Sequence, residues 1–219
     1  MILSRSSILQ STNSLPGITI EKIIKEKDFY KIIMHISCSS QINGAKVFLD
    51  YNILIELPCS YPKILPICYE YGEKKIQSYH HINPDKVGSF CLGTEMEVRY
   101  RLLPNYAISK YFKLIVEYLT IYSYYKKYHT MPVIERSHGN KGILEGYQYL
   151  FKTESRIITL RLLSAIPVKN SDKNLPCPCG SRKKMKKCHY YDLRKITKSH
   201  SLRNQAMNDL AILKDRRNL

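Results

Sequence analysis

The sequence predicts an α+β fold, a four-strand antiparallel meander with flanking helices, plus a small cysteine-rich knuckle near the carboxy terminus. Three observations predict it. Apolar residues alternate with period two early in the chain, they recur at helical spacing further on, and three cysteines crowd into residues 177–188. A chain of 219 residues can bury one core of ordinary size and carry a small appendage.

The meander is predicted from three β-rich runs at residues 18–25, 29–38 and 46–57. In the third run every second residue from Val47 to Leu57 is apolar, as one buried face of a strand requires. Short polar turns separate the runs, as in hairpins. Residues 57–66 contain three prolines, which exclude a central strand there, and a fourth short run follows them.

Helices are predicted in the second half of the chain. Apolar residues at helical spacing predict a helix over residues 106–125, with Asn105 as its amino-terminal cap. Residues 129–142 are predicted to be a connector because they contain proline and glycine. One or two further helices are expected over residues 143–163, and then a linker at residues 166–173.

The net charge of +17 is unevenly distributed. Residues 169–219 carry 14 Lys and Arg against 4 Asp and Glu, a net +10. This segment can contact a polyanion such as nucleic acid or the ribosome by releasing counterions, and the alternative is a solvated cationic face. No apolar run approaches the roughly 18 residues of a spanning helix, and the amino end lacks the order of a secretory signal. We expect a cytoplasmic protein with no membrane partner.

The knuckle offers four metal ligands, which are Cys177, Cys179, Cys188 and His189. Three thiolates and one imidazole form a closed tetrahedral set suited to structural zinc. Gly180 lets the backbone turn between the two pairs of ligands. The alternative is a basic loop with incidental thiols. A catalytic zinc is disfavoured because protein atoms fill all four positions.

The same residues resemble the SEC-C motif, which is found at the carboxy terminus of the SecA translocase and in many bacterial proteins. The Cys-Pro-Cys-Gly-Ser opening and the Lys-Lys-Cys-His closing match, and the four candidate ligands occupy the ligand positions of the motif. Arg182 stands where glycine is usual, and Met185 where an aromatic residue is usual. The resemblance implies structural Zn²⁺ in a module that serves as an interaction platform.

Another cysteine stands in residues 79–93, a stretch that we call the cysteine loop. Cys91 follows Asn83 by eight residues, across a turn that contains proline, aspartate and glycine. A nucleophilic cysteine in acyl transfer needs an exposed sulfur and a donor aimed at the developing oxyanion, and the amide of Asn83 can be that donor. The alternative is a small buried cysteine between apolar neighbours.

The order of elements resembles the ubiquitin-conjugating (UBC) fold over about residues 18–125. The family's Tyr-Pro-x-x-x-Pro loop matches residues 61–66, its His-Pro-Asn matches residues 81–83, and its Gly-x-x-Cys-Leu matches residues 88–92. Ile82 replaces the family's proline, so the loop loses a fixed φ and gains an N–H. The chain also lacks the tryptophan that is usual after the active site.

The resemblance implies a transferase. Cys91 would accept an activated ubiquitin-like modifier from an activating enzyme as a thioester and pass it to an amine on a protein acceptor. Asn83 would stabilise the oxyanion, and His81 would structure the loop that holds Asn83. Glu95 and Glu97 are nearby in the sequence, but neither is assigned a role toward the acceptor. The implied setting is a bacterial conjugation system, of a kind linked to anti-phage defence.

This interpretation divides the chain into four segments. They are a UBC-like conjugating domain at residues 1–128, a helical extension and linker at 129–173, the SEC-C motif at 174–191, and a basic helical tail at 192–219.

Two other functions remain open from the sequence. One is a catalytically inactive UBC-like zinc adaptor that binds protein, or binds nucleic acid through the basic segment. The other is a cysteine hydrolase, for which the sequence assigns no histidine as base among His80, His81 and His129.

Overall fold

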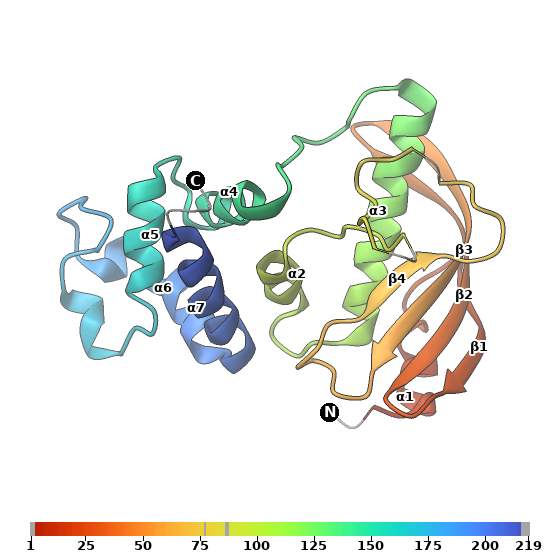
Figure 1. Cartoon of the computed structure of the whole chain (residues 1–219), viewed down its shortest axis with the longest axis horizontal. Coiled ribbons are helices and arrows are strands. Elements are labelled where there is room, and N and C mark those ends of the chain that lie inside the picture. The colour runs from red at the N-terminus through yellow and green to blue at the C-terminus, as the bar shows by residue number, and fades with distance from the viewer. Residues whose placement is uncertain (1–2, 77, 86–87, 216–219) are drawn as a thin grey trace. The chain divides into compact units, whose positions relative to one another are not determined.

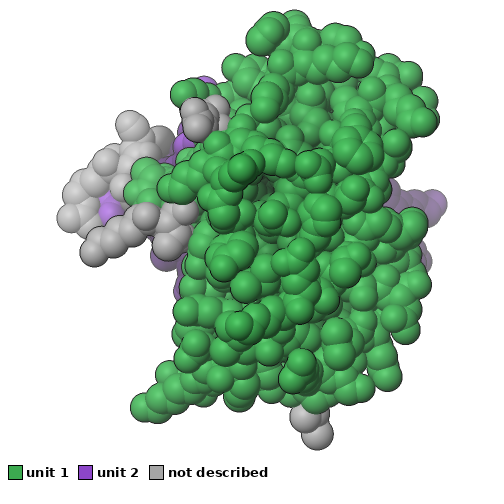
Figure 2. Space-filling model, turned by 90° about the vertical axis from the view of Figure 1, so that its right-hand side faces the viewer, with its two compact units in different colours: residues 1–93, 101–135 green, residues 94–100, 136–219 purple. Residues whose placement is uncertain are grey.

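The computed structural model describes residues 3–76, 78–85 and 88–215. Two compact units make up the chain, coloured separately in Figure 2. Unit 1 comprises residues 1–93 and 101–135, and unit 2 comprises residues 94–100 and 136–219. The passage from residue 135 to residue 136 lies within the connector expected at residues 129–142. In the described part of the chain, no helix combines the length and the apolar character needed to cross a membrane.

Unit 1 contains a four-strand antiparallel sheet in the order β1-β2-β3-β4 (Figure 1). Its strands are β1 (Ile18–Lys25), β2 (Phe29–Ile42), β3 (Ala45–Pro58) and β4 (Ile67–Glu70). The predicted α+β class with a four-strand meander and flanking helices is therefore confirmed.

The hairpin between β2 and β3 is longer than the sequence predicts. Pairing continues to the partners Ile42 and Ala45, and only two residues join the strands. Asn43 has φ 49° and Gly44 has φ 78°. Positive φ at both positions matches the right-handed twist of the paired strands, and asparagine followed by glycine is the combination that best tolerates it. The polar residues before this turn thus belong to the strand.

One long helix, α3 (Ile108–Tyr128), lies against the sheet and closes the core of unit 1 (Figure 1). Its buried face includes Phe112, Ile115 and Leu119, and it packs on the apolar faces of β2 and β3. The predicted cap at Asn105 is wrong, because Ala107 occupies the N-cap position. Tyr106 has a left-handed φ of 50°, so the helix cannot extend back to Asn105.

The proline-rich segment after β3 is attached to the rest of unit 1 by two tyrosine hydroxyls. Tyr61 donates to the carbonyl of Tyr106 at 2.8 Å, and Tyr111 of α3 donates to the carbonyl of Pro66 at 2.7 Å. Both tyrosines are buried. A short helix, α1 (Arg5–Gln10), precedes the sheet and contributes the buried Ile8.

Unit 2 is helical. It contains most of α2 (Glu95–Leu102), followed by α4 (Gly139–Phe151), α5 (Arg156–Ser164), α6 (Tyr190–Lys198), α7 (His200–Lys214) and two short 3₁₀ turns, η1 (Ser171–Asn174) and η2 (Met185–Lys187). Helix α7 packs on α4, α5 and α6. The basic tail expected at residues 192–219 is therefore helical over most of its length, and residues 216–219 lie outside the described part.

A buried polar contact crosses the helices of unit 2. The hydroxyl of Tyr147 on α4 donates to Asp209 on α7 at 2.8 Å, and the amide of Gln205 donates to the same carboxylate at 2.9 Å. Asp209 is only 3% exposed. Burial raises its pKa, although the two hydrogen bonds oppose that shift.

Candidate active site and metal centre

The cysteine loop is closed by a short antiparallel backbone pairing. Ile82 and Phe90 are bridge partners. On one side of them the N–H of Asn83 donates to the carbonyl of Ser89, and on the other the N–H of Cys91 donates to the carbonyl of His81, both at 2.8 Å. Lys86 and Val87, between the paired segments, lie outside the described residues. Because side chains alternate along paired strands, His81, Asn83 and Cys91 share one face.

The opposite face of this pairing is fastened to the core. Phe90 is buried, its N–H donates to the carbonyl of Cys68 on β4 at 2.8 Å, and its ring stacks on Tyr118 of α3 with centroids 4.4 Å apart. The hydroxyl of Tyr118 donates to the carbonyl of His81 at 3.1 Å. The sheet and the long helix thus both hold the backbone that carries Cys91.

The amide of Asn83 is directed into the loop. Its nitrogen donates to the hydroxyl of Ser89 at 3.0 Å and to the carbonyl of Phe90 at 3.4 Å. Ser89 is 2% exposed, and Asp85 accepts hydrogen bonds from both its N–H and its hydroxyl. Asp85, Ser89 and Asn83 therefore form a chain of hydrogen bonds across the turn.

Ile82, which replaces the proline expected from the family resemblance, has its extra N–H satisfied. That group donates to the carbonyl of Tyr79 at 3.2 Å and closes a turn. The Ile82 side chain also lies near Gly88, where an added Cβ would come within 3.5 Å of it. The hydrogen bond to Tyr79 and the pairing with Phe90 thus hold the position that a proline ring would otherwise restrict.

The acidic residues that follow Cys91 in the sequence are engaged within unit 2. Glu95 pairs with Arg99 at 2.6 Å. Glu97 accepts from the backbone N–H of Thr94 at 3.0 Å and also pairs with Arg136. Both carboxylates therefore stabilise the start of α2.

The carboxylate that meets the cysteine loop is Glu135, which the sequence reasoning missed. It pairs with His80, and its Oε1 lies 3.4 Å from Nε2 of His81. Glu135 is far from the loop in sequence, in a segment with no regular pattern, so no local signal could have identified it.

Cys91 is half-buried, as is Cys38, whereas Cys68 is buried and Cys59 is exposed. Cys68 is fully buried, and burial raises its pKa to about 12, so it is inert as a nucleophile. Cys59 is exposed and lies 2.7 Å from the ammonium group of Lys25. Of the three candidate histidines, His81 is the one whose backbone pairs with Cys91.

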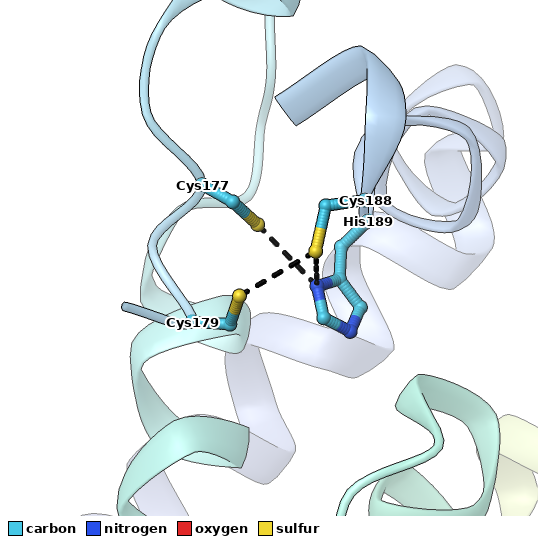
Figure 3. A group of neighbouring side chains, drawn as sticks. All are labelled: Cys177, Cys179, Cys188 and His189. Atoms are coloured by element: carbon cyan, nitrogen blue, oxygen red, sulfur yellow. Dashed lines mark hydrogen bonds between the residues drawn. The ribbon is translucent and has the colours of Figure 1, made fainter. Parts of the chain in front are cut away.

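In unit 2 the four ligand atoms of Cys177, Cys179, Cys188 and His189, which we call the Cys/His cluster, lie within 4.8 Å of one another (Figure 3). Nδ1 of His189 is 3.3 Å from the sulfur of Cys177 and 3.1 Å from that of Cys188. The sulfurs of Cys179 and Cys188 are 3.5 Å apart. This arrangement could bind a metal ion.

The hydrogen bond of Nε2 of His189 determines which tautomer of the ring faces the other ligands of the Cys/His cluster. Nε2 lies 3.0 Å from the carbonyl of Phe151 at the end of α4. A carbonyl only accepts, so Nε2 carries the proton and Nδ1 presents its lone pair to the sulfurs. This is the tautomer that a metal ligand requires, with the outer hydrogen bond that usually supports one.

The backbone around the Cys/His cluster is folded by its own hydrogen bonds. The N–H of Cys177 donates to the carbonyl of Lys183 at 2.9 Å, and Pro176 pairs with Lys184 in a bridge. Gly180 has φ +83°, which allows the reversal between Cys177 and Cys188. Met185 is the buried apolar residue of this turn.

The thiols of the cluster differ in acidity. Burial raises the pKa of Cys177 to about 11. Burial also acts to raise the pKa of Cys179, but hydrogen bonds from Ser181 and the neighbouring thiols outweigh it and lower the value to about 6. Without a metal ion, the thiol of Cys179 should therefore lose its proton more readily than that of Cys177.

No model of a protein family matches this chain, and no curated protein or solved structure matches it. The two sites are therefore interpreted from their own geometry and chemistry.

Proposed function

We propose that the protein is a conjugating enzyme for a ubiquitin-like protein, with Cys91 as the residue that carries the modifier. The thiolate of Cys91 attacks the carbonyl carbon at the carboxyl terminus of the modifier, which the activating enzyme carries as a thioester; a new C–S bond forms, the bond to the activating enzyme's sulfur breaks, and that sulfur leaves as the thiolate. An amine of the acceptor then attacks the thioester carbonyl, the C–S bond breaks, and sulfur leaves as the thiolate. The observation that carries this proposal is the backbone pairing that puts Cys91, Asn83 and His81 on one face.

The contacts of Asn83 indicate that its amide orders the cysteine loop before the modifier binds. Both donors of its amide are used, and the bond to the carbonyl of Phe90 is the longer, at 3.4 Å. An oxyanion formed at Cys91 is a stronger acceptor than a neutral carbonyl, so it can replace Phe90 as the partner. Asn83 therefore first orders the loop and then stabilises the tetrahedral intermediate.

Loading of the modifier tests the role of Cys91. The chain is incubated with a cognate activating enzyme, ATP and a ubiquitin-like modifier, and adducts are separated with and without thiol. We expect a thiol-labile adduct, which Cys91→Ser converts to a thiol-resistant ester and Cys91→Ala abolishes. Cys59→Ala is the matched control, since Cys59 is an exposed cysteine of the same unit. An adduct that persists in Cys91→Ala would disprove the proposal.

Discharge of the loaded protein to free lysine tests Asn83. We expect Asn83→Ala to load normally and to discharge on the order of 100-fold more slowly, as when an oxyanion donor is lost. Asn52→Ala is the control, because Asn52 is exposed on β3. Normal discharge by the Asn83 variant would remove Asn83 from the mechanism.

We propose Zn²⁺ as the metal of the Cys/His cluster. Around tetrahedral zinc, bonds of about 2.3 Å to sulfur and about 2.0 Å to nitrogen separate two sulfurs by about 3.8 Å, and sulfur from nitrogen by about 3.5 Å. Three of the separations in the cluster, from 3.1 to 3.5 Å, are slightly shorter than these values, and all ligand atoms lie within 4.8 Å of one another. With four protein ligands, the metal would have a structural role, and the knuckle would serve as a docking module.

A second candidate function rests on the exposed cations of the knuckle. Arg182, Lys183, Lys184, Lys186 and Lys187 are all exposed, and none makes an ion pair with another described residue. Such a surface suits a polyanion, as in an adaptor that contacts RNA. Binding to a single-stranded RNA would weaken steeply as salt rises from low to physiological concentration, and a flat response would exclude this candidate.

A further inference from the structure

A second group of ligand atoms lies in unit 1, apart from the Cys/His cluster. The two ring nitrogens Nε2 of His80 and His81 and a carboxylate oxygen of Glu135 all lie within 4.8 Å of one another. Both imidazoles approach the same oxygen, Oε1. The two rings are 4.5 Å apart between centroids. We call these three residues the His/Glu cluster.

The local backbone explains how two consecutive histidines face one carboxylate. In an extended strand, neighbouring side chains would point to opposite faces. Here the N–H of Ile82 donates to the carbonyl of Tyr79, so residues 79–82 form a turn, and both imidazoles approach Oε1 of Glu135. Ser78, just before the turn, has a left-handed φ of 53°.

The turn is held in place by a group of aromatic rings. Tyr79 is 4% exposed, and its ring packs against Tyr118, Tyr122 and Tyr125 of α3 with centroids 5.0 to 5.7 Å apart. The ring of His80 also meets Tyr125 edge-on. The histidines are therefore positioned by the core of unit 1, and ligands that are positioned in advance lose little freedom when a metal binds.

We propose that His80, His81 and Glu135 form a second metal site, for a divalent transition-metal ion such as Zn²⁺, Co²⁺ or Ni²⁺. Two imidazoles and one carboxylate favour these ions over Mg²⁺ and Ca²⁺, which prefer oxygen ligands alone. Three protein ligands leave at least one position for water, because the three side chains are between 19% and 43% exposed. The site thus differs from the closed Cys/His cluster in both donor set and access.

This site takes two of its ligands from the cysteine loop, and one of them, His81, is the backbone partner of Cys91. Metal binding would tie the turn at residues 79–82 to Glu135, the last residue of unit 1. The inference goes beyond conjugation and does not depend on it, since metal binding is measured in the absence of any modifier.

Cobalt binding to the full-length protein tests the site. The Cys/His cluster is first saturated with one equivalent of Zn²⁺, which Co²⁺ does not displace because zinc binds such sites more tightly. Co²⁺ is then titrated and followed by visible absorption and by calorimetry. We expect one further equivalent to bind with d–d bands and without the thiolate-to-cobalt charge-transfer band of a sulfur site.

Matched variants locate the bound cobalt. Glu135→Gln and His80→Ala should weaken the second site by at least on the order of 10- to 100-fold, the loss that even an outer partner of a ligand causes. Glu154→Gln and His200→Ala, which change exposed residues of unit 2, should leave it unchanged. Absence of a second equivalent, or equal cobalt binding by all four variants, would overturn the proposal.

Discussion

Cys91 meets His81 through the backbone, whereas the Cys/His cluster brings sulfur to His189 through side chains. In the cluster, four side chains converge around a turn that buries Met185 and packs on α6. At Cys91 a single sulfur is carried by a backbone that is fastened to β4 and α3. The backbone at Cys91 is thus held by protein contacts, and the four side chains of the Cys/His cluster are arranged so that a metal ion could hold them together.

Removing the metal should produce the largest difference between the two sites. A metal bound by the Cys/His cluster contributes on the order of 10 kcal/mol to folding, so a strong chelator or Cys188→Ser should unfold the knuckle. Hydrogen exchange should show lost protection over residues 175–198 and unchanged protection in β2 and β3. Cys59→Ser is the control. Full protection of the knuckle after measured removal of all metal would contradict this prediction.

Ser89→Ala should disturb the cysteine loop and leave the Cys/His cluster intact. Ser89 is buried and accepts the amide of Asn83, so its removal leaves Asn83 and Asp85 with unsatisfied groups. The expected cost to unit 1 is about 1–3 kcal/mol, together with slower discharge from Cys91. The loss in free energy of unfolding of unit 1 is measured in urea, with hydrogen exchange of the β3 amides as the readout. Ser37→Ala, at an exposed position of β2, should change neither quantity.

Asp209→Asn should have the smallest effect. It changes the helical core of unit 2 without changing a residue of the Cys/His cluster. The pKa of Asp209 is raised in the folded state, so that state binds a proton more tightly than the unfolded chain does. Relative to the asparagine variant, the wild-type protein should gain stability as pH falls from neutral toward about 4. We expect a change of a few tenths to about 1 kcal/mol.

The difference in unfolding free energy between wild type and Asp209→Asn, measured across this pH range with metal present, checks that sign. Glu154→Gln is the control, because Glu154 is exposed. A difference that grows in the opposite direction would show that the carboxylate is stabilised by its partners Tyr147 and Gln205 more than burial destabilises it.

The sheet could be predicted closely because its signal is local. Strand β1 has the predicted bounds, and β3 differs by one residue at each end. The long β2–β3 pairing could not be predicted in full, because the residues before Asn43 are polar and gain their strand conformation from the partner strand. The start of α3 was misplaced for a similar reason, since nothing local indicates the left-handed conformation of Tyr106.

The two candidate sites differ in the same way. All four residues of the Cys/His cluster lie within thirteen consecutive positions, so their spacing alone predicts that they meet. The spacing of Asn83 and Cys91 also suggested that these two residues meet across a turn, but it did not predict the backbone pairing of His81 with Cys91. Glu135 reaches His80 only because α3 crosses the sheet and returns the chain to the loop, and that contact depends on the tertiary fold.

The hydrogen bond from His189 to the carbonyl of Phe151 has a consequence for how unit 2 responds to its surroundings. It joins a candidate metal ligand to the end of α4, so ion binding at the proposed zinc site would be coupled to helix packing. By mass action, each tenfold fall in free metal concentration above the dissociation constant removes about 1.4 kcal/mol from the stability of the folded state. The lifetime of unit 2 in the presence of proteases should therefore follow the supply of metal, while that of unit 1 should respond only to a metal that the proposed site at the His/Glu cluster binds.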